Sequence, residues 1–99
     1  MKTFIVGTLT EVMPVEQKGN YSSQRVTIVV KEFDRETGQP KQEEVFQPVI
    51  FNKSIAQVNA KSLEGKRVMA TCWLRSLRSE KDGKVFFNLA LNCTSITLA

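Results

Sequence analysis

Apolar and polar residues alternate with a period of two along most of the chain, and turn residues divide this alternation into five segments. The most β-prone of them contains the run Val26-Thr27-Ile28-Val29-Val30. Alternation of this kind turns one face of a strand to a core and the other to solvent. The pattern therefore predicts an all-β domain whose strands cover residues 3–12, 24–33, 44–51, 67–77 and 84–98.

One segment departs from the alternation and predicts a short helix over residues 53–63. Asn52 or Ser54 is suited to cap it, Gly65 ends it, and one face carries Ile55, Val58 and Leu63. Three strands, one helix and a two-stranded hairpin follow one another as in the OB-fold, a five-stranded Greek-key barrel. We therefore expect a single OB-fold domain over residues 1–99, with its helix between the third and fourth strands.

Turn signals separate the strands at Lys18-Gly19-Asn20, in the polar loop 34–42 and at Asp82-Gly83. Asp-Gly favours a two-residue hairpin, which pairs Lys81 with Lys84 and brings Cys72 opposite Cys93. The cysteines are expected to be buried free thiols. This register predicts a barrel-facing side with Val68, Ala70, Cys72 and Leu74 against Phe87, Leu89, Leu91 and Cys93. It predicts an opposite side with Met69, Thr71, Trp73 and Arg75 against Phe86, Asn88, Ala90 and Asn92.

The composition limits the chemistry more than it specifies it. A net charge of +4 fits a polyanion binder, and the absence of histidine removes the commonest general base and metal ligand. Two cysteines cannot form a four-ligand zinc site, and the neighbouring Glu43 and Glu44 are expected to be merely solvated. We expect no enzyme activity, no metal and no cofactor. The short apolar run before Gly7 predicts a first strand instead of a signal peptide or membrane span, and hence a cytoplasmic protein.

Several segments resemble bacterial single-stranded DNA-binding proteins, over nearly the whole chain. They are the opening strand Phe4-Ile5-Val6-Gly7-Thr8-Leu9, the charged Thr-Gly loop between Phe33 and Phe46, the step Phe51-Asn52-Lys53, and the strand from Val68 to Arg75. The resemblance implies that the aromatics at Phe33, Phe46 and Phe51 stack on bases. The chain departs from the family in having Phe in place of two tryptophans, no stacking Trp in its last hairpin loop and no acidic C-terminal tail.

Primosomal replication protein N, a small dimeric OB protein, also has no acidic tail, and the segment Phe46-Gln47-Pro48-Val49-Ile50 resembles its third strand. Uncharacterised small OB proteins of Bacteroidete type share the same strand order, as would a reduced plasmid or phage single-strand binder.

Binding of unpaired nucleic acid requires aromatic faces for the bases and cations for the phosphates. Phe46 and Phe51 have opposite parity unless Pro48 lies at a bulge, and we favour Phe51 as the exposed ring. Tyr21 is a weaker candidate, whereas Phe4 and Phe87 are expected to be structural. The candidate rings are Phe33, Phe46, Phe51, Trp73 and Phe86; the candidate cations are Arg25, Lys31, Arg35, Lys41, Lys53, Arg75, Arg78 and Lys84.

The expected function is binding of single-stranded DNA, or of RNA, without sequence preference, in replication, repair or primosome assembly. We expect a homodimer or homotetramer with replication proteins as further partners. The alternative is an OB-fold module for protein interaction or assembly that uses Trp73, Met69 and Phe86.

Overall fold

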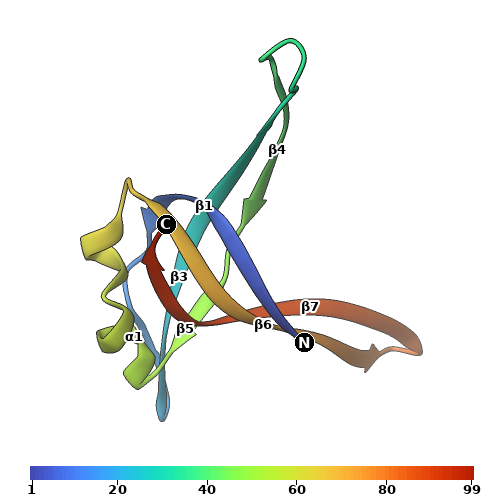
Figure 1. The fold of residues 1–99 in the computed structure, drawn as a ribbon. Helices are drawn as coiled ribbons and strands as arrows, with labels where there is room; N and C mark the ends of the chain where they lie inside the picture. The colour runs from blue at the N-terminus through green and yellow to red at the C-terminus, as the bar shows by residue number, and fades with distance from the viewer.

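Five strands form a closed barrel in the computed structural model, which describes every residue from Met1 to Ala99 (Figure 1). The hydrogen-bonded order is β1-β6-β7-β5-β3, and pairing of β1 with β3 closes the sheet. All pairs are antiparallel except the short parallel contact between β5 and β7. The barrel strands are β1 (Lys2–Val12), β3 (Tyr21–Phe33), β5 (Val49–Phe51), β6 (Arg67–Lys81) and β7 (Lys84–Leu98).

The core fills this barrel with side chains of alternate strand positions, as the two-residue period predicts. Fully buried residues include Leu9, Ile28, Ile50 and Val68, each worth about 1.5–3 kcal/mol on burial. The short helix α1 (Lys53–Val58) and the 3-10 turn η1 (Ala60–Leu63) add Val58 and Ala60 to this core, with Ile55 and Leu63 packed beside them. The apolar helix face predicted from the sequence is therefore confirmed.

β1 and β3 approach each other closely at Gly7. A Cβ atom at this position would lie 2.5 Å from the carbonyl oxygen of Val29 and 3.0 Å from Cγ2 of Ile28. Both neighbours are held by the barrel, one of them as backbone, so only glycine fits without a shift of the strands. Closure of the barrel depends on this residue.

Two hairpins run past the end of the barrel and give the molecule extents of 49 × 36 × 22 Å (Figure 1). One joins the end of β3 to β4 (Pro40–Phe46), and the other joins β6 to β7 through Asp82 and Gly83. Both turn residues of the second hairpin have positive φ, 53° and 75°, as the Asp-Gly signal predicts. The hairpins diverge from each other, and α1 lies on the side of the barrel away from the β6–β7 hairpin.

The strand predicted over 44–51 is wrong in its continuity, because the chain breaks at Gln47-Pro48 into β4 and β5. Pro48 is buried, and its carbonyl accepts a hydrogen bond from the N–H of Val26 at 3.1 Å. Proline has no N–H for the ladder, which explains the interruption. The last three residues of the predicted loop 34–42 belong to β4, which begins at Pro40. The sequence pattern also missed β2 (Glu16–Lys18), which pairs with β3.

The helix predicted over 53–63 is also divided, because Asn59 has a left-handed conformation with φ of 49° and ends α1. Asn52 precedes the helix but does not cap it with its side chain; its Oδ1 accepts a hydrogen bond from the N–H of Ser22 instead. Gly65, with φ of 84°, follows η1 as expected. No helix of the protein has the length and hydropathy needed to cross a bilayer.

The register of the last hairpin is confirmed, including Lys81 opposite Lys84 and Cys72 opposite Cys93. The placement of Phe87 and Leu89 in the barrel interior is wrong, because the hairpin extends beyond the barrel and leaves them 71% and 73% exposed. Phe4, expected to be structural, is 58% exposed on the outside of β1. Odd and even positions of the two strands were assigned to the correct faces, but this alternation does not show where along the hairpin the barrel ends.

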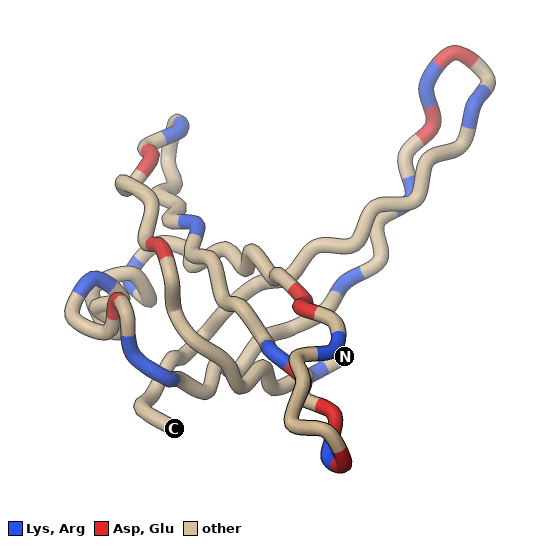
Figure 2. Tube along the Cα trace, turned by 90° about the horizontal axis from the view of Figure 1, so that it is seen from above, with Lys and Arg blue, Asp and Glu red and all other residues tan.

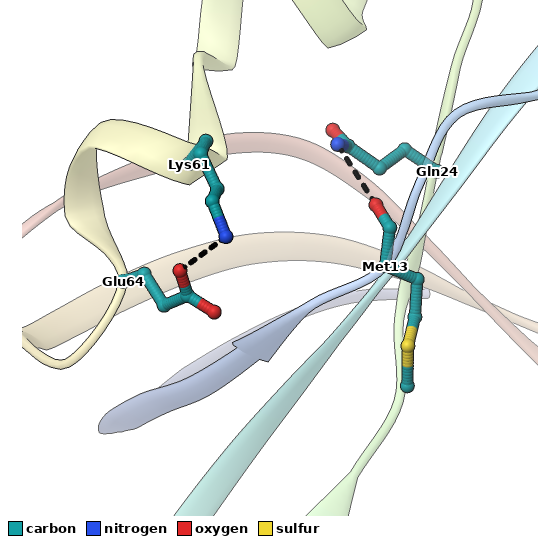
Figure 3. Close-up of polar contacts among 4 residues, drawn as sticks. All are labelled: Met13, Gln24, Lys61 and Glu64. Atoms are coloured by element: carbon teal, nitrogen blue, oxygen red, sulfur yellow. Dashed lines mark hydrogen bonds and ion pairs between the residues drawn. The ribbon is translucent and has the colours of Figure 1, made fainter.

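Two polar contacts fasten the connections around the barrel (Figure 3). The side-chain amide of the buried Gln24 donates to the carbonyl of Met13 at 3.1 Å and so anchors the chain that leaves β1. Lys61 and Glu64 form an ion pair of 2.6 Å within the 3-10 turn. The hydrogen bond from Lys61 lowers the pKa of the Glu64 carboxyl.

Candidate nucleic-acid interface

The pairing of five strands places Trp73 in a row of side chains that crosses the outside of the barrel. Lys2 of β1 lies opposite Trp73 of β6, and Trp73 lies opposite Asn92 of β7. Asn92 lies beside Val49 of β5, which in turn lies opposite Arg25 of β3. Directly paired residues share a face of a sheet, so an indole sits between two cationic side chains on the outer surface.

A hollow of about 510 Å³ opens beside this row. Phe51 comes from the end of β5, Trp73 and Arg75 from β6, and Ser54 from the first turn of α1. The remaining lining residues are Met1, Asn92, Cys93 and Thr94. The structure thus brings together three residues that the sequence selected independently, and Arg75 is the only charged side chain among them.

A β-bulge shapes the floor of this hollow. The register shifts between Thr71 and Cys72, so that Thr71 pairs with Ser95 while Cys72 pairs with Cys93, and Thr94 is left without an opposite residue. The Thr94 hydroxyl donates to the carbonyl of Thr71 at 3.3 Å. Bulges re-aim side chains next to functional sites. The sequence carries a signal that the strand assignment did not use, because the inward apolar positions of β7 change from odd at Leu91 and Cys93 to even at Ile96.

The outer face of the β6–β7 hairpin continues the surface from the hollow to the hairpin tip, and we call it the outer strip. Between Cys72 and Lys81 the register has no further shift, so one parity of each strand stays on this face. Trp73 at the barrel end of the strip and Phe86 near the hairpin tip are 46% and 47% exposed. The outer strip consists of Trp73, Arg75, Leu77, Ser79, Lys81, Lys84, Phe86, Asn88 and Ala90.

Two further aromatic rings lie near the row. Tyr21 stands beside Phe51, with ring centroids 6.2 Å apart and planes tilted by 55°, and both rings remain partly exposed. The Nζ of Lys2 lies 5.6 Å from the ring centroid of Phe4 on the outside of β1. Lys2 was not among the residues selected from the sequence, and Phe4 was expected to be structural, although the alternation of buried Ile5, Gly7 and Leu9 indicates that even positions of β1 face outward.

The β3–β4 hairpin holds a separate group of the predicted residues. Phe33 is exposed at the end of β3, next to the hairpin turn, where Arg35 and Lys41 share a shallow hollow with the carboxylates of Glu32, Asp34 and Glu36. Lys31 forms an ion pair of 3.8 Å with Glu43. Asp34 also accepts hydrogen bonds from the N–H groups of Glu36 and Thr37, which fixes the turn. Nearby carboxylates repel phosphate, so these cations are less suited to it than Arg25 and Arg75.

Besides the group on the β3–β4 hairpin, three further predicted residues lie away from the row and the outer strip. Phe46 pairs with Ile28 and packs against the core, so Phe51 is the ring of the two that faces outward. Arg78 lies opposite Phe87, on the other face of its hairpin. Lys53 is exposed at the start of α1. Phe33, Phe51, Trp73 and Phe86 are all exposed, but Phe33 lies on a different hairpin from the other group.

Figure 2 shows the charges spread over both hairpins and the barrel, with blue and red alternating at the hairpin tips. A net charge of +4 is therefore not concentrated in one field. What distinguishes the row around Trp73 is its local composition, since Lys2, Arg25 and Arg75 have no carboxylate in the row or in the hollow lining. An anion near this surface meets cations and aromatic faces together.

The two cysteines lie behind this surface as free, buried thiols. Cys93 donates to the carbonyl of Ser95 at 3.4 Å. Its hydrogen bond with Cys72, and then burial, raise the pKa of the Cys93 thiol far above its ordinary value. The same hydrogen bond lowers the pKa of the Cys72 thiol, but Cys72 is fully buried and has no access to a reagent or a metal. The two thiols therefore supply packing beneath Trp73 and Asn92.

No model of a known protein family matches the chain, and no curated protein is similar to it in sequence. Solved structures are similar in fold. The small single-stranded DNA-binding protein of Streptomyces coelicolor superposes with a TM-score of 0.62 and 12% identity, covering 100% of this chain and 94% of the other. The Plasmodium falciparum SSB in its complex with ssDNA gives 0.62 and 17%, covering 92% and 83%.

A deletion variant of the single-stranded DNA-binding protein from Thermus aquaticus gives a TM-score of 0.73 with 16% identity. It matches 99% of this chain, which spans 49% of that longer protein. The chain therefore shares with these structures a closed five-stranded barrel with one short helix, consistent with an OB-fold. At these identities the similarity concerns the backbone, and the residues at the interface must be judged by their own geometry.

Proposed function

We propose that this protein binds single-stranded DNA without sequence preference. The observation that carries the proposal is the grouping of Trp73, Phe51 and Arg75 around one open hollow, with Lys2 and Arg25 in the same row of the outer surface. Single-strand binders combine exposed aromatic rings with cations that follow the backbone. The fold shared with three single-stranded DNA-binding proteins supports the same function.

The mechanism follows from the chemistry of the exposed groups. Unstacked bases place their faces on the rings of Trp73 and Phe51, while Arg75 and Arg25 neutralise the phosphates on either side. The outer strip extends this path toward Phe86 and Lys84 at the tip of the β6–β7 hairpin. No base-edge reading is required, because every base has an aromatic face, and this explains the absence of sequence preference.

The cellular role we propose is replication, repair or primosome assembly in the cytoplasm, as a homodimer or homotetramer that also meets replication proteins. One domain of 99 residues presents a single short row of rings, so a second subunit lengthens the path available to a strand. The two hairpins, which project from the barrel, suit such an arrangement (Figure 1).

The single tryptophan allows a direct test, because the indole of Trp73 is itself part of the proposed site. Oligo(dT) should quench its fluorescence, and added salt should reverse the quenching as counterions compete for the phosphates. Duplex DNA of equal length is the control and should quench little at the same salt concentration. Oligo(U) tested in parallel determines whether RNA is also a ligand.

An unchanged spectrum with all three nucleic acids, confirmed by anisotropy of a labelled oligonucleotide, would contradict the proposal. The exposed Met69, Trp73 and Phe86 would then favour the alternative of an interaction module for other proteins.

A further inference from the structure

The N-terminal half of β7 has a free edge. Residues 84–91 pair with β6 on one side, whereas the other side of β7 meets β5 only at Asn92 and Cys93. The backbone N–H and C=O groups along this edge have no strand to bond, which makes the edge a template for pairing with another chain.

This edge lacks the features that protect free edges in monomeric proteins. No charged residue, proline or glycine occurs from Val85 to Leu98. Charged side chains and prolines are the usual means of blocking an edge. The free edge of β6 on the same hairpin shows the contrast, since it carries Arg75, Arg78, Glu80 and Lys81. In Figure 2 one strand of this hairpin bears blue and red segments along its length, and the other stays tan after the turn.

On the face opposite the outer strip, β7 presents a row of exposed apolar side chains, which we call the inner ladder, while the paired positions of β6 on this face include Ser76, Arg78 and Glu80. Phe87 and Leu89 are its most exposed members and exceed every other large apolar residue except Met1 in exposure. The ladder continues into a cleft of about 780 Å³ between the two hairpins, lined in part by Leu74, Leu89 and Leu91. It consists of Val85, Phe87, Leu89, Leu91 and Leu74.

We propose that the β7 edges of two copies of this chain pair antiparallel and form a four-stranded sheet, β6-β7-β7-β6. In such a symmetric pair one residue must lie opposite its own copy, because directly opposed side chains point to the same face of the sheet and the two strands are identical. Centred on Asn88, it uses the whole uncharged segment from Val85 to Leu91. It sets Phe87 opposite Leu89 of the second copy, and Val85 opposite Leu91.

The same register explains why a second copy fits this edge better than a polyanion or an unrelated strand. No like charges meet, because Lys84 falls opposite Asn92 at the ends of the pairing. The amides of the two Asn88 side chains meet at the centre, on the face of the outer strip. The inner ladders of both copies form one continuous apolar surface, and the edge itself offers no cation to a phosphate.

The proposal does not rest on nucleic-acid binding, but it has a consequence for it. A two-fold axis perpendicular to the sheet keeps equivalent faces on the same side. The outer strips of both copies therefore lie side by side on one surface, leaving Trp73 and Phe86 uncovered.

Mass measurement without nucleic acid tests the pairing. The chain of 11.2 kDa should sediment as a dimer of about twice that mass, or as a higher oligomer built from such dimers. Leu89→Lys puts a charge on the inner ladder at an exposed position and should halve the mass while leaving the circular dichroism spectrum unchanged. Val15→Lys is the control, exposed between β1 and β2 and outside the cleft that the inner ladder enters, and should leave the mass unaltered.

A cross-link tests the register. Asn88→Cys places two thiols across the two-fold axis, where Cα atoms of opposed residues are about 4.5–5.5 Å apart, within the range of a disulfide. Oxidised glutathione should convert this variant to a covalent dimer on a non-reducing gel. Leu77→Cys, directly behind Asn88 on β6, should remain monomeric on the gel. A monomeric wild-type protein, a mass that Leu89→Lys does not change, or equal cross-linking of both cysteine variants would overturn the proposal.

Discussion

Trp73 lies directly opposite Asn92 in the β6–β7 ladder, immediately next to the buried pair Cys72 and Cys93. The indole is therefore fixed by a strand that is packed from behind, and its outer face remains open. A ring held in this way loses little conformational freedom when a base stacks on it. Rigid support from the barrel distinguishes Trp73 from Phe86, which lies near the tip of a hairpin without a second layer.

Replacing Trp73 with alanine should weaken oligo(dT) binding by between about fivefold and about 150-fold, since stacking on one aromatic ring contributes about 1–3 kcal/mol. Anisotropy of a fluorescein-labelled oligonucleotide measures this without the tryptophan signal. Leu98→Ala, an apolar truncation at a more exposed position at the far end of β7, is the control and should leave the dissociation constant unchanged. Equal weakening by both variants would argue against a stacking role for Trp73.

Arg75→Gln should lower the salt dependence of binding. If the guanidinium neutralises one phosphate of a single strand, the slope of log K against log salt becomes shallower by about 0.7. Lys61→Gln removes the same charge from the 3-10 turn, where Lys61 is paired with Glu64. The slope of this control should equal that of the wild type, and a matching decrease in both variants would indicate only a general charge effect.

Gly7→Ala should destabilise the barrel by about 1–3 kcal/mol, the usual cost of forcing extra volume into a packed site. The reason is the 2.5 Å approach of the added carbon to the Val29 carbonyl. Urea unfolding followed by circular dichroism measures the free energy of unfolding. Thr8→Ala, one residue later and exposed, should change it by less than about 0.5 kcal/mol. A fully stable Gly7→Ala protein would show that β1 and β3 can separate at this point.

The thiols of Cys72 and Cys93 should resist alkylation in the folded protein at pH 8. Both are buried, and the raised pKa of Cys93 keeps its thiol protonated at that pH, whereas iodoacetamide reacts with thiolates. Mass spectrometry should find no adduct in native buffer and two adducts in 6 M guanidinium. Rapid labelling of the native protein would contradict the packing described for the region behind Trp73.

The strand pattern, the Asp82-Gly83 turn and the opposition of the two cysteines were predictable, because each depends on local alternation or on turn chemistry. The sequence indicated the division of β4 from β5 only through Pro48, which was considered as the position of a bulge in one continuous strand. The bulge at Thr94 was missed, although an extra residue shifts the phase of its strand and the inward positions of β7 do change from odd at Cys93 to even at Ile96.

The candidate site was predictable in part for the same reason. Parity placed Trp73 and Arg75 together and separated Phe51 from Phe46, as the structure does. Parity did not reveal that the β6–β7 hairpin leaves the barrel, so Phe87 and Leu89 were expected in the core. It also did not bring Lys2 opposite Trp73, because that contact depends on the register between two strands far apart in sequence.

The two hairpins beyond the barrel are two-stranded ribbons, and such ribbons are only marginally stable by themselves in water. Their amide hydrogens should therefore exchange with solvent much faster than those of the barrel strands. The barrel amides then serve as an internal reference within each sample. Whatever settles on either ribbon, a nucleotide chain or a second subunit, would reveal its position as a local slowing of deuterium uptake.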